Sequence, residues 1–236
     1  MTALQFELKG KFAHFRRFYT NSSSLSYPVP PPPTIAGLLG AALGLNPDEY
    51  RDVFRDVRFA VRPRASWRQL MQAVNLLKIT EGSENSLRGE EGHTQIPTQL
   101  IAPIDLDDTL AYEVVLSGLE GERRDRLGAA LAAPHYPLYL GTAPCRAWVE
   151  ETMPLEGEVR DGYRGELLGA LDVEATADLA LEEGLRVLRD RYPIRLGQDR
   201  RLTEAKDLFV EAEGQALTCT YDGPVLVSDR GAYALL

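Results

Sequence analysis

The sequence contains very little cysteine: among 236 residues, only Cys145 and Cys219 are present. Two thiols cannot build the disulfide framework of a small secreted domain, and they do not supply a thiolate metal site. Histidine is almost as rare, with His14, His93 and His135 alone, and no carboxylate is spaced to complete a metal site with any of them. We therefore expect no metal ion and no other cofactor.

Long apolar runs are missing as well. The longest uncharged apolar stretch, residues 34–45, contains three glycines and is about half as long as the ~20 residues that a transmembrane helix needs. The amino terminus begins with a strand-like pattern instead of the basic flank and apolar core of a signal peptide. We therefore expect no membrane association and a cytoplasmic location. The content of 44% hydrophobic and 26% charged residues is typical of an ordinary folded protein.

Several familiar signatures of nucleotide binding and catalysis are also absent. The sequence has no phosphate-binding P-loop, no glycine-rich dinucleotide fingerprint after a strand, no nucleophile elbow of the hydrolase type and no zinc-protease helix motif. The three glycines within residues 34–45 lie inside a predicted helix and not before one. These absences exclude the enzyme classes that depend on those motifs.

Negative charge dominates overall, with a net charge of −9, but it is unevenly distributed. Residues 1–100 hold 12 Lys and Arg against 9 Asp and Glu, whereas the remaining residues hold 14 against 26. No acidic residue lies between Asp56 and Glu81, although that segment contains five cations: Arg58, Arg62, Arg64, Arg68 and Lys78. Such a basic stripe on an acidic body is either a solvated face or a single specific site for a polyanion.

Hydrophobic periodicity predicts an α+β fold. The expected elements are a strand over 4–9, a helix over 34–45 with Thr34 as its N-cap, strands over 57–61 and 112–116, a helix over 120–132 and a strand over 146–149. Residues 64–80 fit neither helical nor strand periodicity, residues 81–92 are polar, and residues 94–104 resume an extended pattern. The whole section is interpreted as an insertion. Without it, the order is βαββαβ, which is typical of ferredoxin-like and RNA-recognition folds.

The rest of the chain predicts a second, smaller and more acidic unit. We expect a first domain over residues 1–153 and a small β-rich α/β subdomain over residues 154–236. The elements predicted in this subdomain are a helix around 179–192 and strands over 208–212, 216–221 and 225–227.

The predicted helix over 34–45 has one nearly bare face, formed by Gly37, Gly40, Ala41 and Gly44. Glycine in a helix costs about 1 kcal/mol relative to alanine. Its repeated use on one face indicates that another backbone approaches closely. That backbone belongs either to a packed neighbouring element or to a ligand.

Residues 11–27 interleave cations, rings and small polar groups. Single-stranded RNA is bound by cations on its phosphates, by aromatic planes under its bases and by polar groups at the base edges. The segment supplies all three, in the form of Lys11, Arg16 and Arg17, then Phe15, Phe18, Tyr19 and Tyr27, then Asn21, Ser22, Ser24 and Ser26. We interpret it as an RNA-binding surface, with a protein-binding surface as the alternative.

His14 lies among these cations and has three possible roles. It is the best candidate for a general acid or base in RNA cleavage, because an imidazole titrates near neutral pH. It is equally suited to contact a base or the RNA backbone. The third possibility is a purely structural role in the core.

At two places the sequence resembles the CRISPR-associated protein five family, the RAMP subunits of type I Cascade complexes. Residues 10–16, 19–28 and 33–45 resemble its N-terminal block, most closely that of subtype B. Residues 134–141, followed by Cys145, resemble its second motif, a Pro-x-Tyr-Leu-Gly turn. Together these segments extend over about the first 150 residues.

The resemblance implies a ferredoxin-like domain with an inserted β-hairpin thumb, here within residues 66–103. It further implies a non-catalytic subunit of an antiviral CRISPR complex that caps the 5′ repeat handle of crRNA. The implied partners are the Cascade backbone subunit, the large subunit and, through the complex, target DNA. It adds Thr34 to the RNA-binding residues and assigns thumb contacts to Trp67, Arg68, Met71, Lys78, Thr94 and Gln99.

Two alternatives remain at this stage. One is a metal-independent endoribonuclease that processes CRISPR repeat RNA, as in the subtype C branch, whose cutting relies on a tyrosine, lysine and histidine cluster. No adjacent Lys–His pair is present here, which weighs against cleavage. The other is a protein-interaction module without RNA contact.

Overall fold

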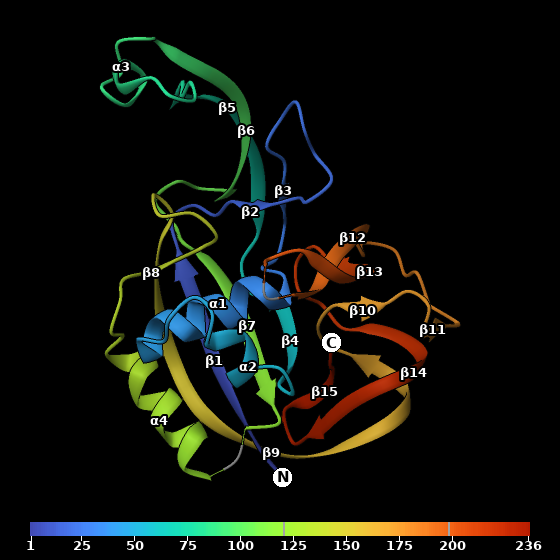
Figure 1. Cartoon of the computed structure of the whole chain (residues 1–236). Helices are drawn as coiled ribbons and strands as arrows, with labels where there is room; N and C mark the ends of the chain where they lie inside the picture. Colours follow the sequence, from blue (N-terminus) through green and yellow to red (C-terminus); the bar gives the residue numbers. More distant parts are fainter. Residues whose placement is uncertain (120, 198) are drawn as a thin grey trace.

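The computed structural model, which describes residues 1–119, 121–197 and 199–236, is rich in β-structure, with a curled antiparallel sheet and few helices (Figure 1). Two shorter strands join the edges of this sheet: β15 (Gly231–Ala234) pairs with β14, and β8 (Leu138–Tyr139) pairs with β9. The main path of the sheet runs, in order, through β11 (Thr176–Ala177), β14 (Leu217–Ser228), β9 (Arg146–Leu167), β1 (Thr2–Gly10), β7 (Leu110–Ser117) and β4 (Arg58–Pro63).

The amino-terminal half of the sheet has the order β9, β1, β7, β4. Helix α1 (Pro32–Leu43) lies between β1 and β4 in the sequence, and α4 (Gly121–Ala132) lies between β7 and β9. Both helices cover one face of the sheet (Figure 1). Leu4, Phe6 and Leu8 of β1 pack beneath them, whereas Glu7 and Lys9 occupy the alternate positions of the strand.

The predicted elements of this half are found close to their expected places. The strands expected over 4–9, 57–61 and 112–116 are β1, β4 and β7, each somewhat longer than predicted. The helix expected over 120–132 is α4, and residue 120 itself lies outside the described residues. Alternation and helical spacing were therefore sufficient wherever one face of an element is buried.

Helix α1 begins earlier than expected. Its N-cap is Pro31, with proline at its first positions, so the assignment of Thr34 as N-cap is wrong. Proline is tolerated in the first turn because the N–H that it lacks has no partner within the helix. The helix ends at Leu43, and Gly44 follows in the left-handed conformation (φ 73°) that favours glycine as a helix terminator.

The bare face of α1 is covered by protein. A Cβ on Gly40 would lie 2.6 Å from Cβ of Tyr50, the first residue of α2 (Tyr50–Val53), and a Cβ on Gly44 would lie 2.8 Å from the ring of His135. The N–H groups of His135 and Tyr136 donate to carbonyls of α1 at 2.9 and 3.2 Å. Close packing of neighbouring elements therefore accounts for these small residues.

Replacement by alanine is expected to change the stability of the protein in opposite directions at two glycines of α1. Gly40→Ala is expected to destabilise the protein by about 1–3 kcal/mol, because its new Cβ would overlap Tyr50. Gly37→Ala is expected to stabilise it by up to about 1 kcal/mol, because the nearest atom of Tyr50 lies 3.9 Å away and alanine favours the helix. Urea unfolding of both variants measures the two changes. The same sign for both would contradict this account of the packing.

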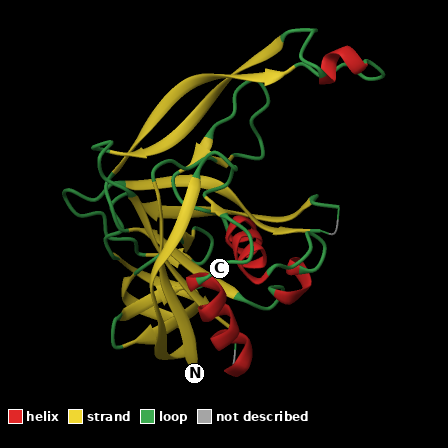
Figure 2. Cartoon of the chain, turned by 90° about the vertical axis from the view of Figure 1, so that its left-hand side faces the viewer, coloured by secondary structure: helices red, strands yellow, loops and turns green. Residues whose placement is uncertain are grey.

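A long β-hairpin projects from the body (Figure 2). It consists of β5 (Trp67–Leu77) and β6 (His93–Pro103), with the single-turn helix α3 (Glu84–Leu87) at its tip. It lies in the section interpreted as an insertion, with the thumb expected within residues 66–103. The extended pattern expected over residues 94–104 is β6, whereas β5 fitted neither period because most of its side chains are exposed and no buried stripe imposes a pattern.

The carboxyl-terminal part of the chain differs from the prediction in one element. The helix predicted around residues 179–192 is wrong, because β12 (Val187–Leu196) begins inside that range and pairs with β13 (Leu202–Glu211). The hydrogen bonds of this ladder, which the sequence does not display, outweigh the local helical spacing. A third strand, β10 (Leu171–Asp172), pairs with the other edge of β13.

Three further strand predictions differ in extent. The strand expected over 208–212 is the end of β13, and the strands expected over 216–221 and 225–227 are a single strand, β14, with an irregularity between Tyr221 and Pro224. The strand expected over 146–149 is the beginning of the 22-residue β9, which passes without interruption through residues 153 and 154. The division into two units at that position stays a prediction. No helix in the described ranges is long and apolar enough to span a membrane.

Candidate nucleic-acid interface

A hollow of about 590 Å³ lies between the base of the hairpin and β12. We call it the arginine groove, because four arginines from distant parts of the chain line it. Each belongs to a different element or turn: Arg17 comes from the amino-terminal segment, Arg68 from β5, Arg186 from the approach to β12 and Arg189 from β12 itself. The other lining residues are Pro28, Trp67, Gln69, Ile104, Leu188, Asp190 and Tyr192.

Positive charge dominates the groove. Asp190 is the one acidic residue among those that line it, against four guanidinium groups. The described parts of the chain place no carboxylate within ion-pair distance of Arg68 or Arg186. Two unpaired guanidinium groups facing one hollow attract an anion, because no protein carboxylate competes for them.

The other two arginines are held in place by carboxylates. Arg17 pairs with Asp190 at 3.1 Å, and its Nε donates to the Ser26 carbonyl at 3.2 Å. Asp190 also accepts a hydrogen bond from the Tyr19 hydroxyl. Arg189 pairs with Asp207 at 2.7 Å on the exposed side of β12. These contacts fix the orientation of the guanidinium groups before any ligand is bound.

Two buried rings, Trp67 and Tyr192, line the groove. Tyr27, which does not line it, stacks on Tyr192 with ring centroids 4.2 Å apart, and the Arg17 guanidinium lies 5.8 Å from the Tyr27 ring centre. Trp67 is buried and donates from Nε1 to the Ala212 carbonyl at 2.7 Å. Burial raises the pKa of the Tyr27 and Tyr192 hydroxyls well above the usual range, so neither adds a negative charge to the groove at neutral pH.

The amino-terminal arm, residues 11–27, clasps the base of the hairpin (Figure 1). Its short strands β2 (Phe15–Arg16) and β3 (Ser26–Tyr27) pair with each other. Backbone hydrogen bonds of 2.8–2.9 Å join Ala13 to Ile101 and Ser24 to Pro97 and Gln99 of β6. The arm thus holds β6 through isolated bridges at Ala13 and Ser24, whereas the tip of the hairpin projects away from the body (Figure 2).

His14 is part of this clasp. It is 5% exposed, with Nδ1 2.8 Å from the Gln99 carbonyl and Nε2 2.8 Å from the Ser24 hydroxyl. Both ring nitrogens are therefore engaged within the protein, which favours the structural role among the three considered. Within the described residues, His, Cys, Asp and Glu form no group of three or more suited to a metal ion.

The two motifs singled out in the sequence meet at the clasp. The N–H of His14 donates to the Leu140 carbonyl at 3.0 Å. A Cβ on Gly141, whose φ is 88°, would lie 2.0 Å from the His14 carbonyl oxygen, and a Cβ on Gly10 would lie 2.6 Å from the Leu140 side chain. Both glycines are thus required by close approach, and the second motif supports the backbone of the first.

The structure divides the predicted RNA-binding residues into two groups. Five have buried side chains, so their surfaces are covered by protein: His14, Phe15, Ser26, Tyr27 and Trp67. Phe15 packs edge-on against Tyr112 with centroids 5.8 Å apart. The stacking on bases that was expected of Phe15 and Tyr27 therefore has no exposed ring face to use.

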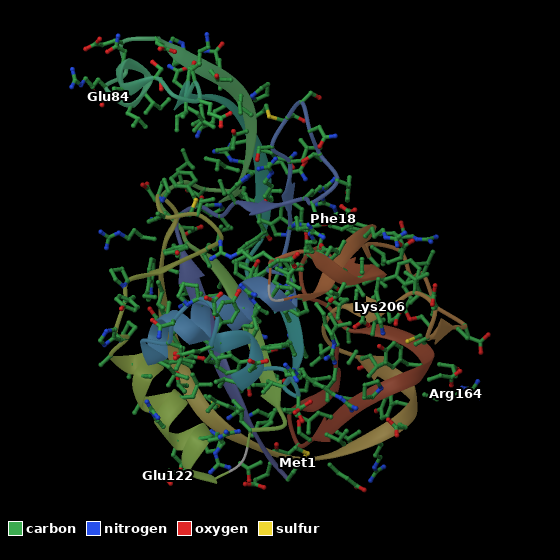
Figure 3. All side chains as sticks on the ribbon, viewed as in Figure 1. Met1, Phe18, Glu84, Glu122, Arg164 and Lys206 are labelled. Atoms are coloured by element: carbon green, nitrogen blue, oxygen red, sulfur yellow. The ribbon has the colours of Figure 1, made fainter. Side chains whose placement is uncertain are left out.

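The remaining predicted residues reach the surface at least in part. The exposed ones are Lys11, Arg16, Phe18, Tyr19, Asn21, Ser22, Arg68, Met71, Lys78 and Thr94, and the half-buried ones are Arg17, Ser24, Thr34 and Gln99. Of all of these, only Arg17 and Arg68 line the groove, together with the buried Trp67. Phe18 lies on the arm above β12 (Figure 3), whereas Met71, Lys78 and Thr94 lie farther out along the hairpin.

Sequence reasoning missed Arg186 and Arg189. Both fall in the acidic part of the chain, and Arg189 lies within the segment wrongly predicted as a helix. A usable signal was present: Arg186, Arg189, Arg191 and Arg195 make residues 186–195 the most basic stretch after residue 150. Nothing in the sequence placed that stretch beside Arg17 and Arg68.

Comparisons with known proteins agree on one family. Residues 3–205 match the family described as CRISPR-associated protein (Cas_Cas5). A CRISPR protein from Archaeoglobus fulgidus has a similar fold, with a TM-score of 0.55 and 13% identity over 100% of this chain and 98% of that chain. A chain of a CRISPR RNA-guided surveillance complex is also similar in fold, with a TM-score of 0.52 and 17% identity over 92% of this chain and 91% of that chain. No curated protein sequence matches. At these identities, the two structures show similarity of fold alone.

Proposed function

Because the chain belongs to the CRISPR-associated protein (Cas_Cas5) family, we propose that it is a non-catalytic subunit of a type I Cascade effector complex and binds the 5′ repeat handle of crRNA in the arginine groove. The proposal includes antiviral defence as the role of that complex and the cytoplasm as its location. The subtype B assignment rests on the wording of the amino-terminal block and is likewise part of the proposal.

The observation that carries the RNA proposal is the convergence of four arginines on one hollow. A polynucleotide presents a phosphate at every residue, and guanidinium groups bind phosphate through charge-assisted, often bidentate, hydrogen bonds. Among the described residues, no carboxylate pairs with Arg68 or Arg186. Arg16 of the arm, next to Arg17 in the sequence, is exposed. Gln69 adds a polar group, and Leu188 and Ile104 add apolar walls against which a base can pack.

The strand order supports the finer description of the fold. The order β9, β1, β7, β4, with one helix after β1 and one after β7, is what a ferredoxin-like βαββαβ arrangement requires. In this interpretation the β5–β6 hairpin is the thumb. Its base borders the arginine groove through Trp67, Arg68 and Gln69, so RNA in the groove would continue along the hairpin.

The proposed partners are the backbone subunit and the large subunit of the complex, with target DNA reached only through the complex. Exposed apolar side chains near the tip of the hairpin support protein contacts there. Met71, Leu76, Leu77, Ile79 and Leu87 are between 46% and 67% exposed. Apolar side chains gathered on a projecting element are typical of a surface that a partner covers.

One assay tests binding and separates it from catalysis. The purified chain is incubated with labelled single-stranded repeat RNA without divalent metal, and binding and cleavage are measured together. We expect saturable binding that weakens as salt rises, because phosphate contacts release counterions, and no specific cut. Absence of binding, both alone and with the partner subunits, would instead favour a protein-interaction module.

The alternative function, a metal-independent endoribonuclease, predicts specific cleavage of the repeat in the same assay. His14 is the histidine that the arm offers, and its two nitrogens contact Gln99 and Ser24. A specific cut that disappears in His14→Asn, in a variant that keeps its thermal stability and RNA affinity, would replace the non-catalytic proposal by this one.

A further inference from the structure

A second, smaller hollow lies on the opposite side of the molecule from the arginine groove. It has a volume of about 150 Å³ and is enclosed by the end of α1, by α2 and by the start of α4. In Figure 1, α4 lies at the lower left and β12 at the upper right. The lining residues are Leu43, Leu45, Val53, Phe54, Leu119, Arg123, Arg126 and Leu127.

The hollow is apolar inside and cationic at its rim. Leu119, Leu127 and Phe54 are buried at its floor, whereas Arg123 and Arg126 are exposed. The two arginines are three residues apart on α4 and flank Leu127, so they share the helix face that looks into the hollow. Among the described residues that line it, none is acidic.

The charges around the hollow leave these two arginines available. On α4, Asp125 pairs with Arg124 at 2.9 Å, and on α2, Asp52 pairs with Arg55. Over the described residues, no carboxylate lies within ion-pair distance of Arg123 or Arg126. Arg123 and Arg126 therefore form a local positive rim around an apolar hollow, on a chain whose net charge is −9.

We propose that this hollow is a docking site for an acidic segment of a partner protein, which inserts one large apolar side chain and sets carboxylates against Arg123 and Arg126. The volume fits this occupant, because about 150 Å³ is less than the 300–1,000 Å³ that a whole small ligand needs and suits one side chain. Charge complementarity selects the flanking residues, because the two rim arginines attract carboxylates on a chain whose net charge is negative. Apolar anchors in pockets bordered by arginine are typical centres of protein interfaces.

RNA fits this hollow less well than a peptide does. Bases are bound by stacking on exposed aromatic or guanidinium planes and by hydrogen bonds at their edges. The guanidinium planes of Arg123 and Arg126 lie at the rim, but the inner walls are aliphatic, and Phe54, the ring among the lining residues, is 4% exposed. The interior therefore offers a base neither a stacking plane nor a hydrogen-bond partner for its edges. The proposal does not depend on RNA binding in the arginine groove.

Peptide binding to the full chain tests the proposal. The probe is a fluorescein-labelled peptide with a central leucine flanked by two glutamates on each side, followed by anisotropy. We expect saturable binding that is lost when serine replaces the leucine or lysines replace the glutamates. Arg123→Gln with Arg126→Gln is expected to weaken binding about tenfold, because two ion pairs at the rim are removed. All four arginines in this test and its control are outside the hydrophobic core, so the variants are expected to fold.

The matched control is Arg124→Gln with Arg160→Gln, which removes the same charge but no lining residue, since Arg124 pairs with Asp125 and Arg160 with Glu158. We expect it to leave the affinity within about twofold of the original value. Three results would overturn the proposal. The first is that the peptide does not bind saturably at about 1 mM protein. The second is that the two double variants lose the same amount of peptide affinity. The third is that an oligouridylate displaces the peptide, which would assign the rim to RNA.

Discussion

Gly141→Ala is expected to destabilise the protein by about 2–5 kcal/mol, which is a large effect for the addition of one methyl group. Its Cβ would lie 2.0 Å from the His14 carbonyl oxygen, so the arm must move away from the turn that supports it. Overpacking of this kind costs about 1–3 kcal/mol, and the left-handed φ of 88° adds about 1–2 kcal/mol for a residue other than glycine. The measurement is the free energy of unfolding in urea.

Gly162→Ala is the matched control. Its φ of 83° is nearly the same, but the nearest atom to an added Cβ, the Tyr221 carbonyl oxygen, lies 3.9 Å away. Only the conformational cost of about 1–2 kcal/mol is then expected. Equal destabilisation by the two substitutions would show that the contact between the turn and the arm does not matter for stability.

The second large effect is expected at the arginine groove. Arg68→Gln with Arg186→Gln is expected to weaken binding of repeat-handle RNA about 100-fold at low salt, because two charge-assisted hydrogen bonds to phosphate are lost. The plot of log affinity against log salt should become less steep by about 1.4, or about 0.7 for each phosphate contact in a single strand. Fluorescence anisotropy over a series of salt concentrations gives both quantities.

The control for the groove removes the same charge elsewhere. Arg164 lies on β9, at the lower right in Figure 3 and far from Phe18 of the arm, and Arg230 lies in the turn between β14 and β15. Arg164→Gln with Arg230→Gln is expected to change the affinity by about twofold or less and to keep the salt slope. If both double variants lose affinity equally, the RNA is attracted by overall charge and the groove is not its site.

Prediction of the fold from the sequence succeeded for strands with a clear apolar pattern. Alternation located β1, and short strand-like stretches located β4 and β7, although β7 is buried along its whole length. The extended pattern expected over residues 94–104 corresponds to β6, whereas β5 fitted neither period because most of its side chains are exposed on both faces. β12 was mistaken for a helix because its ladder with β13 is a long-range contact without a local signal.

The predicted site residues overlap the arginine groove only in part. The interleaved rings and cations of residues 11–27 indicated a surface near the arm, and three of the predicted residues, Arg17, Trp67 and Arg68, line the groove. The same pattern could not tell Phe18, which is 41% exposed, from Phe15, which is 2% exposed. Neighbouring aromatic residues have equal intrinsic tendencies, and only packing against Tyr112 decides that Phe15 points inward.

The sequence alone determined the family resemblance, the basic arm on an acidic chain and the glycines that allow close approach, because each of these depends on residue type and local spacing. Only the tertiary structure decided that Arg186 and Arg189 stand opposite Arg17 and Arg68, that His14 is engaged inside a clasp, and that Arg123 and Arg126 border an apolar hollow. The physical reason is that electrostatic attraction depends on distance in space, and tertiary packing brings together charges, such as Arg17 and Arg186, that lie far apart along the chain.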